Sequence, residues 1–278
     1  MEYIWNITSR CNLKCSYCWD PFKLEKELTY DECCCLLDGL VSNKCETIIF
    51  TGGEPTVRKD LFDIAEYAFS KGVNNLKICS NGVNLVKIGG RLNESPIQEI
   101  HISLNDVVDI TERRDSENFQ RVIGQLITNR KKIVFVTIIE WRHIEKYKEI
   151  LQLAKQLGAL VSPQFMTGGD EVCLKPDTVE LVNIFKEIKE LHSLYSGQIE
   201  PYVLNFCNIS KQYYCQNLVP NSCKAGTEFK IVSPAGNVRN CYWKEDCQEE
   251  IKKCFSDKCL VWFRYNRRVA KIYEMFRD

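Results

Sequence analysis

Residues 11–18 read CNLKCSYC and place Cys11, Cys15 and Cys18 at C-x3-C-x2-C spacing. This stretch directly follows a short apolar run, Tyr3–Thr8, that is typical of a buried strand. Thiolates this close in sequence can bind one iron–sulfur cluster, and a four-iron cluster with only three protein ligands keeps one iron open. A zinc-binding loop or a redox C-x2-C pair is the alternative interpretation of the same spacing.

The composition indicates a reduced, globular chain with more cysteine than packing requires. The 278 residues include 16 Cys, and 37 basic residues balance 37 acidic ones. No segment has the layout of a signal peptide or the length of a membrane span, so we expect a cytoplasmic location, where thiols stay reduced. Zero net charge gives no argument for binding nucleic acid or a membrane. The cysteines gather towards both ends of the sequence, which suggests two metal-type sites flanking a scaffold.

The scaffold alternates short apolar runs with longer amphipathic ones. Strands are predicted over Thr47–Phe50, Leu76–Cys79, Glu99–Leu104, Ile133–Ile139 and Leu160–Met166, after the first strand. Helical patterns lie between them, one beginning after an N-cap at Thr29 and others over Asp60–Ser70, Phe119–Asn129, Ile144–Leu157 (stopped by Gly158) and Asp177–Leu194. Six successive β-α units predict an α/β fold with a parallel sheet, either open or closed into a partial barrel.

The pattern changes near residue 200. Phe229–Val232 and Val238–Trp243 flank Ser-Pro-Ala-Gly-Asn and predict a hairpin, and a basic, aromatic helix is expected from about Leu260. We therefore expect a core domain over residues 1–199 and a small second domain over residues 200–278.

Three further segments stand at the ends of predicted strands: TGGEP at residues 51–55, SNG at 80–82 and ISLN at 102–105. Together with CNLKCSYC, and in this order, they resemble the motifs of the radical S-adenosylmethionine (SAM) enzymes. Parallel α/β folds build their sites at the carboxyl ends of their strands, which is where all four segments lie. The resemblance covers about residues 1–195 and implies a partial (β/α)6 TIM-type barrel that holds SAM and a 4Fe-4S cluster.

The resemblance also implies roles for individual residues. Cys11, Cys15 and Cys18 would ligate the cluster whose open iron binds SAM. The SAM contacts implied are Tyr17 near the adenine, Gly52 and Gly53 through close backbone approach, Glu54 as a charged or backbone acceptor, and Ser80, Asn81 and Ser103 at the ribose and methionine. Arg113 or Arg114 would pair with the SAM carboxylate, although Asn105 replaces the usual Asp and leaves that assignment open; our choice is Arg114. Tyr17 as a packed loop aromatic and either Arg as a surface residue are the alternatives.

The C-terminal cysteines resemble a second cluster site. Cys223, Gly236 and Cys241 have the C-x12-G-x4-C spacing that opens SPASM and shorter twitch domains of radical SAM enzymes. The dense cysteine run of a full SPASM tail is missing, so the twitch form with one auxiliary 4Fe-4S cluster is implied. Its implied ligands are Cys223, Cys241, Cys254 and Cys259, with Cys247, Cys207 and Cys215 left open. A structural zinc site is the alternative.

Other cysteines are given no ligand role. Cys33, Cys34 and Cys35 fall in a predicted helix, where consecutive side chains point about 100° apart and cannot share a metal, so we expect them to pack. Cys79 and Cys173 are candidates for donating hydrogen to a substrate radical, with packing as the alternative.

The implied function is reductive cleavage of SAM followed by hydrogen abstraction from a substrate, an oxidoreductase-type reaction with flavodoxin or ferredoxin as electron donor. A peptide side chain or backbone is the first substrate class. A small metabolite such as an amino sugar alcohol is the alternative, because the sequence begins directly on the first strand without a leader-binding domain. An interaction protein that binds an Fe–S cluster or zinc without catalysis is the alternative from another class.

Overall fold

The computed structural model describes residues 1–15, 18, 22, 25–105, 116–139, 143–165, 178–200 and 226–241. These residues belong to two compact units, each with its own contacts. The first unit contains the described parts of residues 1–103, 110–133 and 225–247, and the second those of residues 104–109, 134–224 and 248–278.

The first unit is built on a mainly parallel sheet. Its strands are β1 (Glu2–Thr8), β2 (Thr47–Gly52), β3 (Asn75–Ser80), β4 (Ile97–Ser103), β7 (Phe229–Val232) and β8 (Val238–Arg239). β1 to β4 pair in chain order and all run parallel. β7 pairs with the free side of β1, also parallel, and β8 returns antiparallel to β7. The predicted hairpin therefore forms, but it extends the sheet of the first unit, and its second strand ends earlier than predicted.

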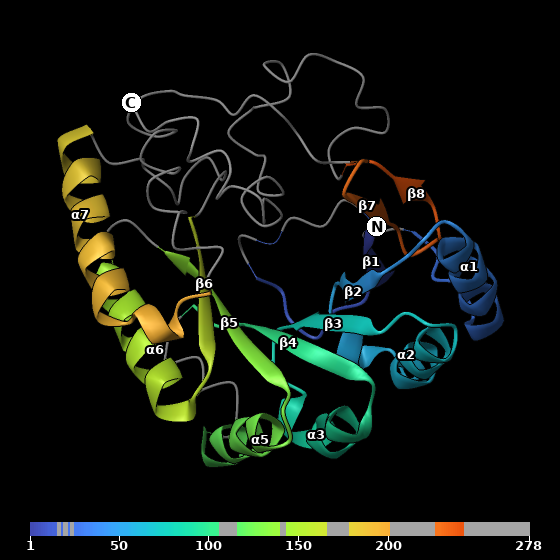
Figure 1. The fold of residues 1–278 in the computed structure, drawn as a ribbon, viewed down its shortest axis with the longest axis horizontal. Coiled ribbons are helices and arrows are strands. Elements are labelled where there is room, and N and C mark those ends of the chain that lie inside the picture. The colour runs from blue at the N-terminus through green and yellow to red at the C-terminus, as the bar shows by residue number, and fades with distance from the viewer. Residues whose placement is uncertain are drawn as a thin grey trace. The chain divides into compact units, whose positions relative to one another are not determined.

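Helices cover one face of this sheet (Figure 1). They are α1 (Tyr30–Ser42), α2 (Leu61–Ser70), α3 (Leu85–Glu94) and α5 (Ser116–Thr128), with a short 3-10 turn η1 (Pro55–Val57). Trp5, Phe50, Ile78 and Ile100 are register partners across four neighbouring strands, and each is at most 1% exposed. Because side chains alternate between the faces of a strand, this buried row marks the apolar face that the helices cover.

Local sequence explains where α1 begins, and tertiary packing explains why α3 escaped prediction. Thr29 caps α1 with a reciprocal capping box to Glu32, as the sequence predicts.

α3 carries Gly89 and Gly90, which are poor helix formers and weaken its helical pattern in the sequence. A Cβ at Gly89 would lie 2.7 Å from a methyl carbon of Val122 on α5, so the glycine permits close packing of two helices.

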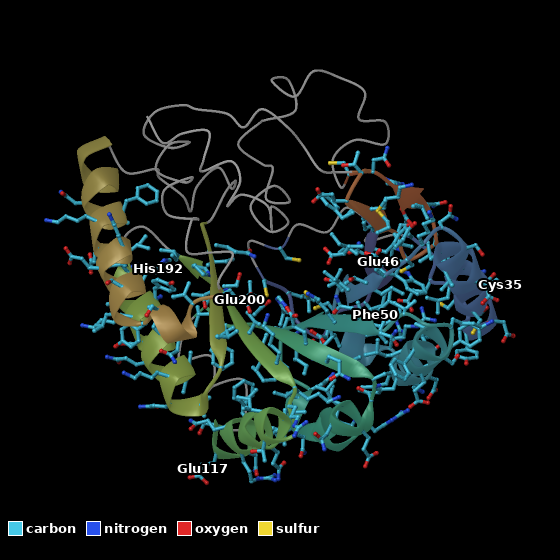
Figure 2. All side chains as sticks on the ribbon, viewed as in Figure 1. Cys35, Glu46, Phe50, Glu117, His192 and Glu200 are labelled. Atoms are coloured by element: carbon cyan, nitrogen blue, oxygen red, sulfur yellow. The ribbon has the colours of Figure 1, made fainter. Side chains whose placement is uncertain are left out.

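The second unit contains β5 (Lys132–Ile139), whose first two residues belong to the first unit, and β6 (Leu160–Phe165), which pair in parallel. Its helices are α6 (Ile144–Leu157), α7 (Thr178–Leu194) and the 3-10 turn η2 (Ser196–Gln198). α6 ends at Gly158 in a left-handed conformation, as predicted. Between α6 and α7, the Tyr147 hydroxyl lies 2.7 Å from Nε2 of His192, a buried side chain (Figure 2). Burial lowers the pKa of His192 to about 4.

The predicted fold class is confirmed: β1 to β6 are parallel within their units, and a helix follows each of them in the chain. Among the described residues, no helix is long and apolar enough to cross a membrane.

Candidate active site

Three strand-end segments of the first unit meet at one edge of the sheet. The amides of Gly53 and Glu54, after β2, donate to the carbonyls of Thr8, the last residue of β1, and Arg10, at 2.9 and 2.8 Å. The side-chain amide of Asn81, after β3, donates to Oδ1 of Asn12 at 2.8 Å and lies 3.9 Å from Sγ of Cys11. The structure therefore brings together the first cysteine motif, the Gly-Gly-Glu turn and the Ser-Asn-Gly turn.

Gly52 and Gly53 are required by backbone crowding against the end of β1. Gly52 has a φ of +136°, and a Cβ built there would lie 2.2 Å from the carbonyl oxygen of Thr8. A Cβ at Gly53 would lie 2.2 Å from the carbonyl oxygen of Arg10. These contacts are with the chain that leads into the cysteine motif, and the approach of the two glycines to SAM stays a prediction.

Glu54 is fully buried and joins the two turns through its carboxylate. Oε1 accepts from the Ser80 hydroxyl at 2.8 Å and from the backbone and hydroxyl of Thr56 at 3.1 and 2.6 Å. Oε2 accepts from the Asn81 amide at 2.6 Å. Four donors therefore satisfy the buried charge, and Ser80 and Asn81 are held by Glu54.

The cysteine loop, defined here as residues 9–29, carries the three cysteines of the first motif. Cys11 and Cys18 are exposed and Cys15 is half-buried, and the Cys18 amide closes a turn onto the Cys15 carbonyl at 3.1 Å. Within the part of the chain that the structure describes, no three Cys, His, Asp or Glu side chains are gathered to hold a metal ion. Three thiols on one accessible loop at the carboxyl end of β1 nevertheless fit the donor set of an iron–sulfur cluster.

Two of the remaining motif residues lie at strand ends. Ser103 is the exposed last residue of β4, beside Ile102, the register partner of Ser80. Asn105, which stands where related enzymes have Asp, belongs to the second unit and accepts a hydrogen bond from the Ile138 amide at 3.0 Å. The Asn is thus used to hold its own segment to β5.

A charged row, which the sequence motifs do not predict, lies on the other face of the first unit's sheet. Oε1 of Glu99 lies 2.6 Å from Nε2 of His101, and Oε2 lies 3.1 Å from Nζ of Lys77 and 3.6 Å from Nζ of Lys132. Burial alone would raise the pKa of Glu99, but the hydrogen bond with His101 and the nearby charges hold it well below its ordinary range. The sequence does contain a signal for this row, because Glu99 and His101 occupy alternate positions of a predicted strand and must therefore share one face.

Two charged residues at the base of the cysteine loop were also missed. Glu27 accepts from the Thr8 hydroxyl at 2.5 Å and forms a two-point ion pair with Arg10, whose Nε and Nη2 lie 3.0 and 2.9 Å from the carboxylate oxygens. Arg58, three residues after Pro55, is buried and donates to the carbonyls of Ile7 and Leu28. Neither residue belongs to a motif used above, so only tertiary contacts reveal them.

The predicted packing role fits one of the three consecutive cysteines best. Cys33 is fully buried, and burial raises the pKa of its thiol to about 11. Cys34 is half-buried, whereas Cys35 is exposed on the outer side of α1 (Figure 2). Cys79 is half-buried on β3.

Several predicted site residues lie outside the described residues. They are Tyr17, Arg113 and Arg114 of the SAM contacts, Cys223, Cys254 and Cys259 of the auxiliary ligands, and Cys173, Cys207, Cys215 and Cys247. Of the auxiliary ligands, Cys241 is described; it is buried and lies two residues after β8.

Comparison with known proteins agrees with these motifs. Residues 5–139 match the family model of the radical SAM superfamily. The chain is also 32% identical to the GTP 3',8-cyclase of Lactiplantibacillus plantarum, over 91% of this chain and 82% of that protein. The chain belongs to the radical SAM superfamily. It is therefore a radical SAM enzyme, and its family implies a 4Fe-4S cluster and SAM as cofactors.

Peptide-modifying proteins are among its other relatives. The chain is 24% identical to the PqqA peptide cyclase of Bradyrhizobium diazoefficiens, over 96% of this chain and 73% of that protein. Its fold resembles Streptococcus suis SuiB with a TM-score of 0.64 at 16% identity, over 95% of this chain and 66% of the SuiB chain, just under two thirds. SuiB bound to its precursor peptide SuiA gives a TM-score of 0.65 at 15% identity, over 97% and 66% of the two chains. These likenesses confirm the partial TIM-type radical SAM fold.

Proposed function

We propose that this radical SAM enzyme modifies a peptide, at a side chain or the backbone, with Cys11, Cys15 and Cys18 as ligands of the SAM cluster. The observation that carries the site is the meeting of three strand-end segments, in which Asn81 contacts Asn12 beside Cys11. When bound, the cluster would supply the electron that splits SAM into methionine and a deoxyadenosyl radical, which removes hydrogen from the substrate.

The chain's own residues would bind the cluster and orient SAM. The three thiols hold the cluster, and the Gly53 and Glu54 amides fix the backbone from which Cys11 departs. Ser80, Asn81 and Ser103 lie at the carboxyl ends of β3 and β4 and would offer polar groups to SAM. Tyr17 and Arg114, which lie outside the described residues, are the other SAM contacts that we propose. Buried Glu54 fixes the positions of the Ser80 hydroxyl and the Asn81 backbone, so these groups need little reorganisation on binding.

Two relatives support a peptide as the substrate. SuiB is known in complex with its precursor peptide SuiA, and its fold matches 97% of this chain. A PqqA peptide cyclase matches 96% of it. Since these matches extend past residue 200, we also propose a twitch-like domain over residues 200–278. Its auxiliary 4Fe-4S cluster would be bound by Cys223, Cys241, Cys254 and Cys259.

Anaerobic reconstitution with iron and sulfide tests the core of the proposal. Wild-type protein should hold about eight irons per chain and form deoxyadenosine from SAM with dithionite. Cys18→Ala should abolish deoxyadenosine formation. Cys35→Ala, at an exposed cysteine on α1, is the matched control and should leave it unchanged. Persistent SAM cleavage in Cys18→Ala would refute the cluster assignment, and no cleavage in wild type would favour a non-catalytic Fe–S or zinc protein.

Iron content separates the two clusters. A Cys11/Cys15/Cys18→Ala triple variant should keep about four irons per chain, held by the auxiliary site. Loss of nearly all iron from this variant would refute the twitch-like domain while leaving the SAM cluster assignment intact.

A small-molecule substrate is the second candidate, favoured by the 32% identity to a GTP 3',8-cyclase. GTP is the first probe for this class, and a short peptide encoded beside the chain's reading frame is the probe for the proposal. Mass spectrometry should show a mass change in the peptide that depends on SAM and reductant. Conversion of GTP with no change in the peptide would replace the peptide proposal with the small-molecule one.

A further inference from the structure

Arg58 connects the two ends of the cysteine loop. Its Nη1 donates to the Ile7 carbonyl, in β1 just before the loop, at 2.8 Å. Its Nη2 donates to the Leu28 carbonyl, at the far end of the loop, also at 2.8 Å. These two carbonyls are 21 residues apart in sequence, so one planar guanidinium closes the base of the whole loop.

The charge of Arg58 is buried, and Asp60 compensates it. The Arg58 side chain is 4% exposed, and its Nε and Nη2 lie 2.9 and 3.0 Å from the two carboxylate oxygens of Asp60. Nη2 also lies 3.3 Å from Sγ of Cys33 on α1. A buried cation is costly unless it is paired and hydrogen-bonded. Asp60 and the loop carbonyls meet that need together, which ties the loop to the start of α2.

Other contacts hold the same two ends. At the first end, the Glu54 amide donates to the Arg10 carbonyl at 2.8 Å. At the second end, the Leu28 amide donates to the Pro234 carbonyl in the turn between β7 and β8 at 3.0 Å. Cys11 and Cys18, by contrast, are exposed residues. The loop thus has a fixed base and accessible ligands.

We propose that Arg58 is a positioning residue for the SAM cluster: its guanidinium joins both ends of the cysteine loop, so that Cys11, Cys15 and Cys18 are presented from a base formed before iron binds. Arg58 itself is not a ligand. This role rests on the proposed function of the three cysteines, but the contribution of Arg58 to the loop base can be measured on metal-free protein, separately from iron binding.

Two substitutions at Arg58 separate the effect of its two-armed hydrogen bonding from the effect of its positive charge. Arg58→Lys keeps a buried cation, but a single ammonium cannot reproduce the two-armed contact to Ile7 and Leu28. Arg58→Met removes the charge. Lys131→Met is the matched control, because Lys131 is another buried cation of the first unit whose Nζ donates to two carbonyls, Ser95 and Ile97, at 2.6 and 2.8 Å. If Arg58→Met does not fold, Arg58→Lys decides.

Hydrogen exchange of the metal-free protein is the first measurement. Arg58→Lys should speed exchange of peptides spanning residues 9–29 by at least about tenfold, the effect of losing a charge-assisted hydrogen bond, and leave β3 and β4 unchanged. Lys131→Met should not alter the loop. Unchanged loop exchange in Arg58→Lys would overturn the positioning role, whatever the iron content.

Cluster retention is the second measurement. After both proteins are reconstituted, Arg58→Lys should lose iron to a chelator about tenfold faster than wild type does. Its reduced cluster should also show a smaller change of EPR signal than wild type when SAM is added. Lys131→Met should match wild type in both. A loosened loop that retains iron as wild type does would also overturn the proposal. Wild type that takes up no iron at all would instead refute the proposed function, leaving the exchange result to decide the closed base.

Discussion

The turns after β2 and β3 differ from the cysteine loop after β1 in how completely the protein satisfies them. In the first two, the carboxylate of Glu54 is fully buried and has four donors from Thr56, Ser80 and Asn81. In the cysteine loop, the backbone at both ends is held by hydrogen bonds, yet Cys11 and Cys18 are exposed residues. This edge of the sheet therefore combines a buried, fully hydrogen-bonded carboxylate with exposed cysteines of the type that bind an iron–sulfur cluster.

Energetics account for this difference. A buried polar group without its partners costs free energy, so the Glu54 network must be complete in the folded protein. Exposed cysteines do not have this free-energy cost, so the fold does not require a partner for them before a metal binds. Substitutions in the two regions should therefore differ in their effect on stability.

Removing the Glu54 carboxylate should have the largest effect. Glu54→Ala leaves the donors of Ser80, Asn81 and Thr56 without their acceptor, which should lower the free energy of unfolding by roughly 3–5 kcal/mol. Urea denaturation of the metal-free protein measures it. Glu46→Ala, at a side chain 80% exposed, should change stability by less than about 0.5 kcal/mol. Equal losses in the two variants would contradict the difference drawn between the two regions.

The second unit contains a buried imidazole, His192, whose charged form is disfavoured by burial. His192 has a pKa of about 4 in the folded protein because of burial, against an ordinary value near 6.5, so the unfolded state binds the proton more readily. Stability should be complete above pH 6.5 and fall as the pH drops towards 4, by on the order of 3 kcal/mol at pH 4.

Urea denaturation between pH 8 and pH 4 measures this loss, and His192→Gln should flatten the profile. His143→Gln, at a half-exposed side chain, should retain the wild-type profile. An acid profile that survives His192→Gln would show that another group is responsible.

Adding a methyl group at Gly53 should disturb the first end of the cysteine loop, near Arg10. The Cβ of Gly53→Ala would meet the Arg10 carbonyl oxygen at 2.2 Å, which must displace the loop backbone and should cost roughly 2 kcal/mol. Iron retention after reconstitution should fall with it. Gly90→Ala on α3, where nothing lies within 4 Å of the new Cβ, should instead stabilise by about 0.5–1 kcal/mol. The idea fails if both variants keep wild-type stability and iron.

Protonation of Glu27 in acid should have the smallest effect on stability. Burial alone would raise the pKa of Glu27, but hydrogen bonds from Arg10 and Thr8 outweigh it and hold the pKa below its ordinary value. Its contribution is therefore present above about pH 4.5 and is lost as the pH falls through the lowered pKa. Because Arg10 is 58% exposed, the contribution should be under about 1 kcal/mol.

Hydrogen exchange of residues 9–15 detects so small a change. Glu27→Gln should show at pH 7 the faster exchange that wild type reaches only in acid, after correction for intrinsic rates. Asp63→Asn, which breaks an exposed pair with Arg91, is the control and should leave this segment unchanged. Unaltered exchange in Glu27→Gln would remove Glu27 from the base of the loop.

Prediction from sequence succeeded where the signal is local. Helix α6 was predicted with its observed bounds, Ile144–Leu157, because its periodic pattern ends at a glycine. α3 was missed because Gly89 weakens the helical signal for the sake of a contact with Val122, 33 residues away. The register of β7 beside β1 was equally beyond reach, since the hairpin pattern does not show which sheet edge it joins.

The sequence alone was enough for the superfamily: the cysteine spacing and three strand-end motifs carry the resemblance to radical SAM enzymes, because residue type and order are properties of the sequence. The contacts that hold the site could be found only in the folded protein. Glu54 joins two turns and Arg58 joins the ends of a loop 21 residues apart through contacts between segments distant in sequence. Such contacts depend on where the strands end in space, and residue spacing alone does not specify that.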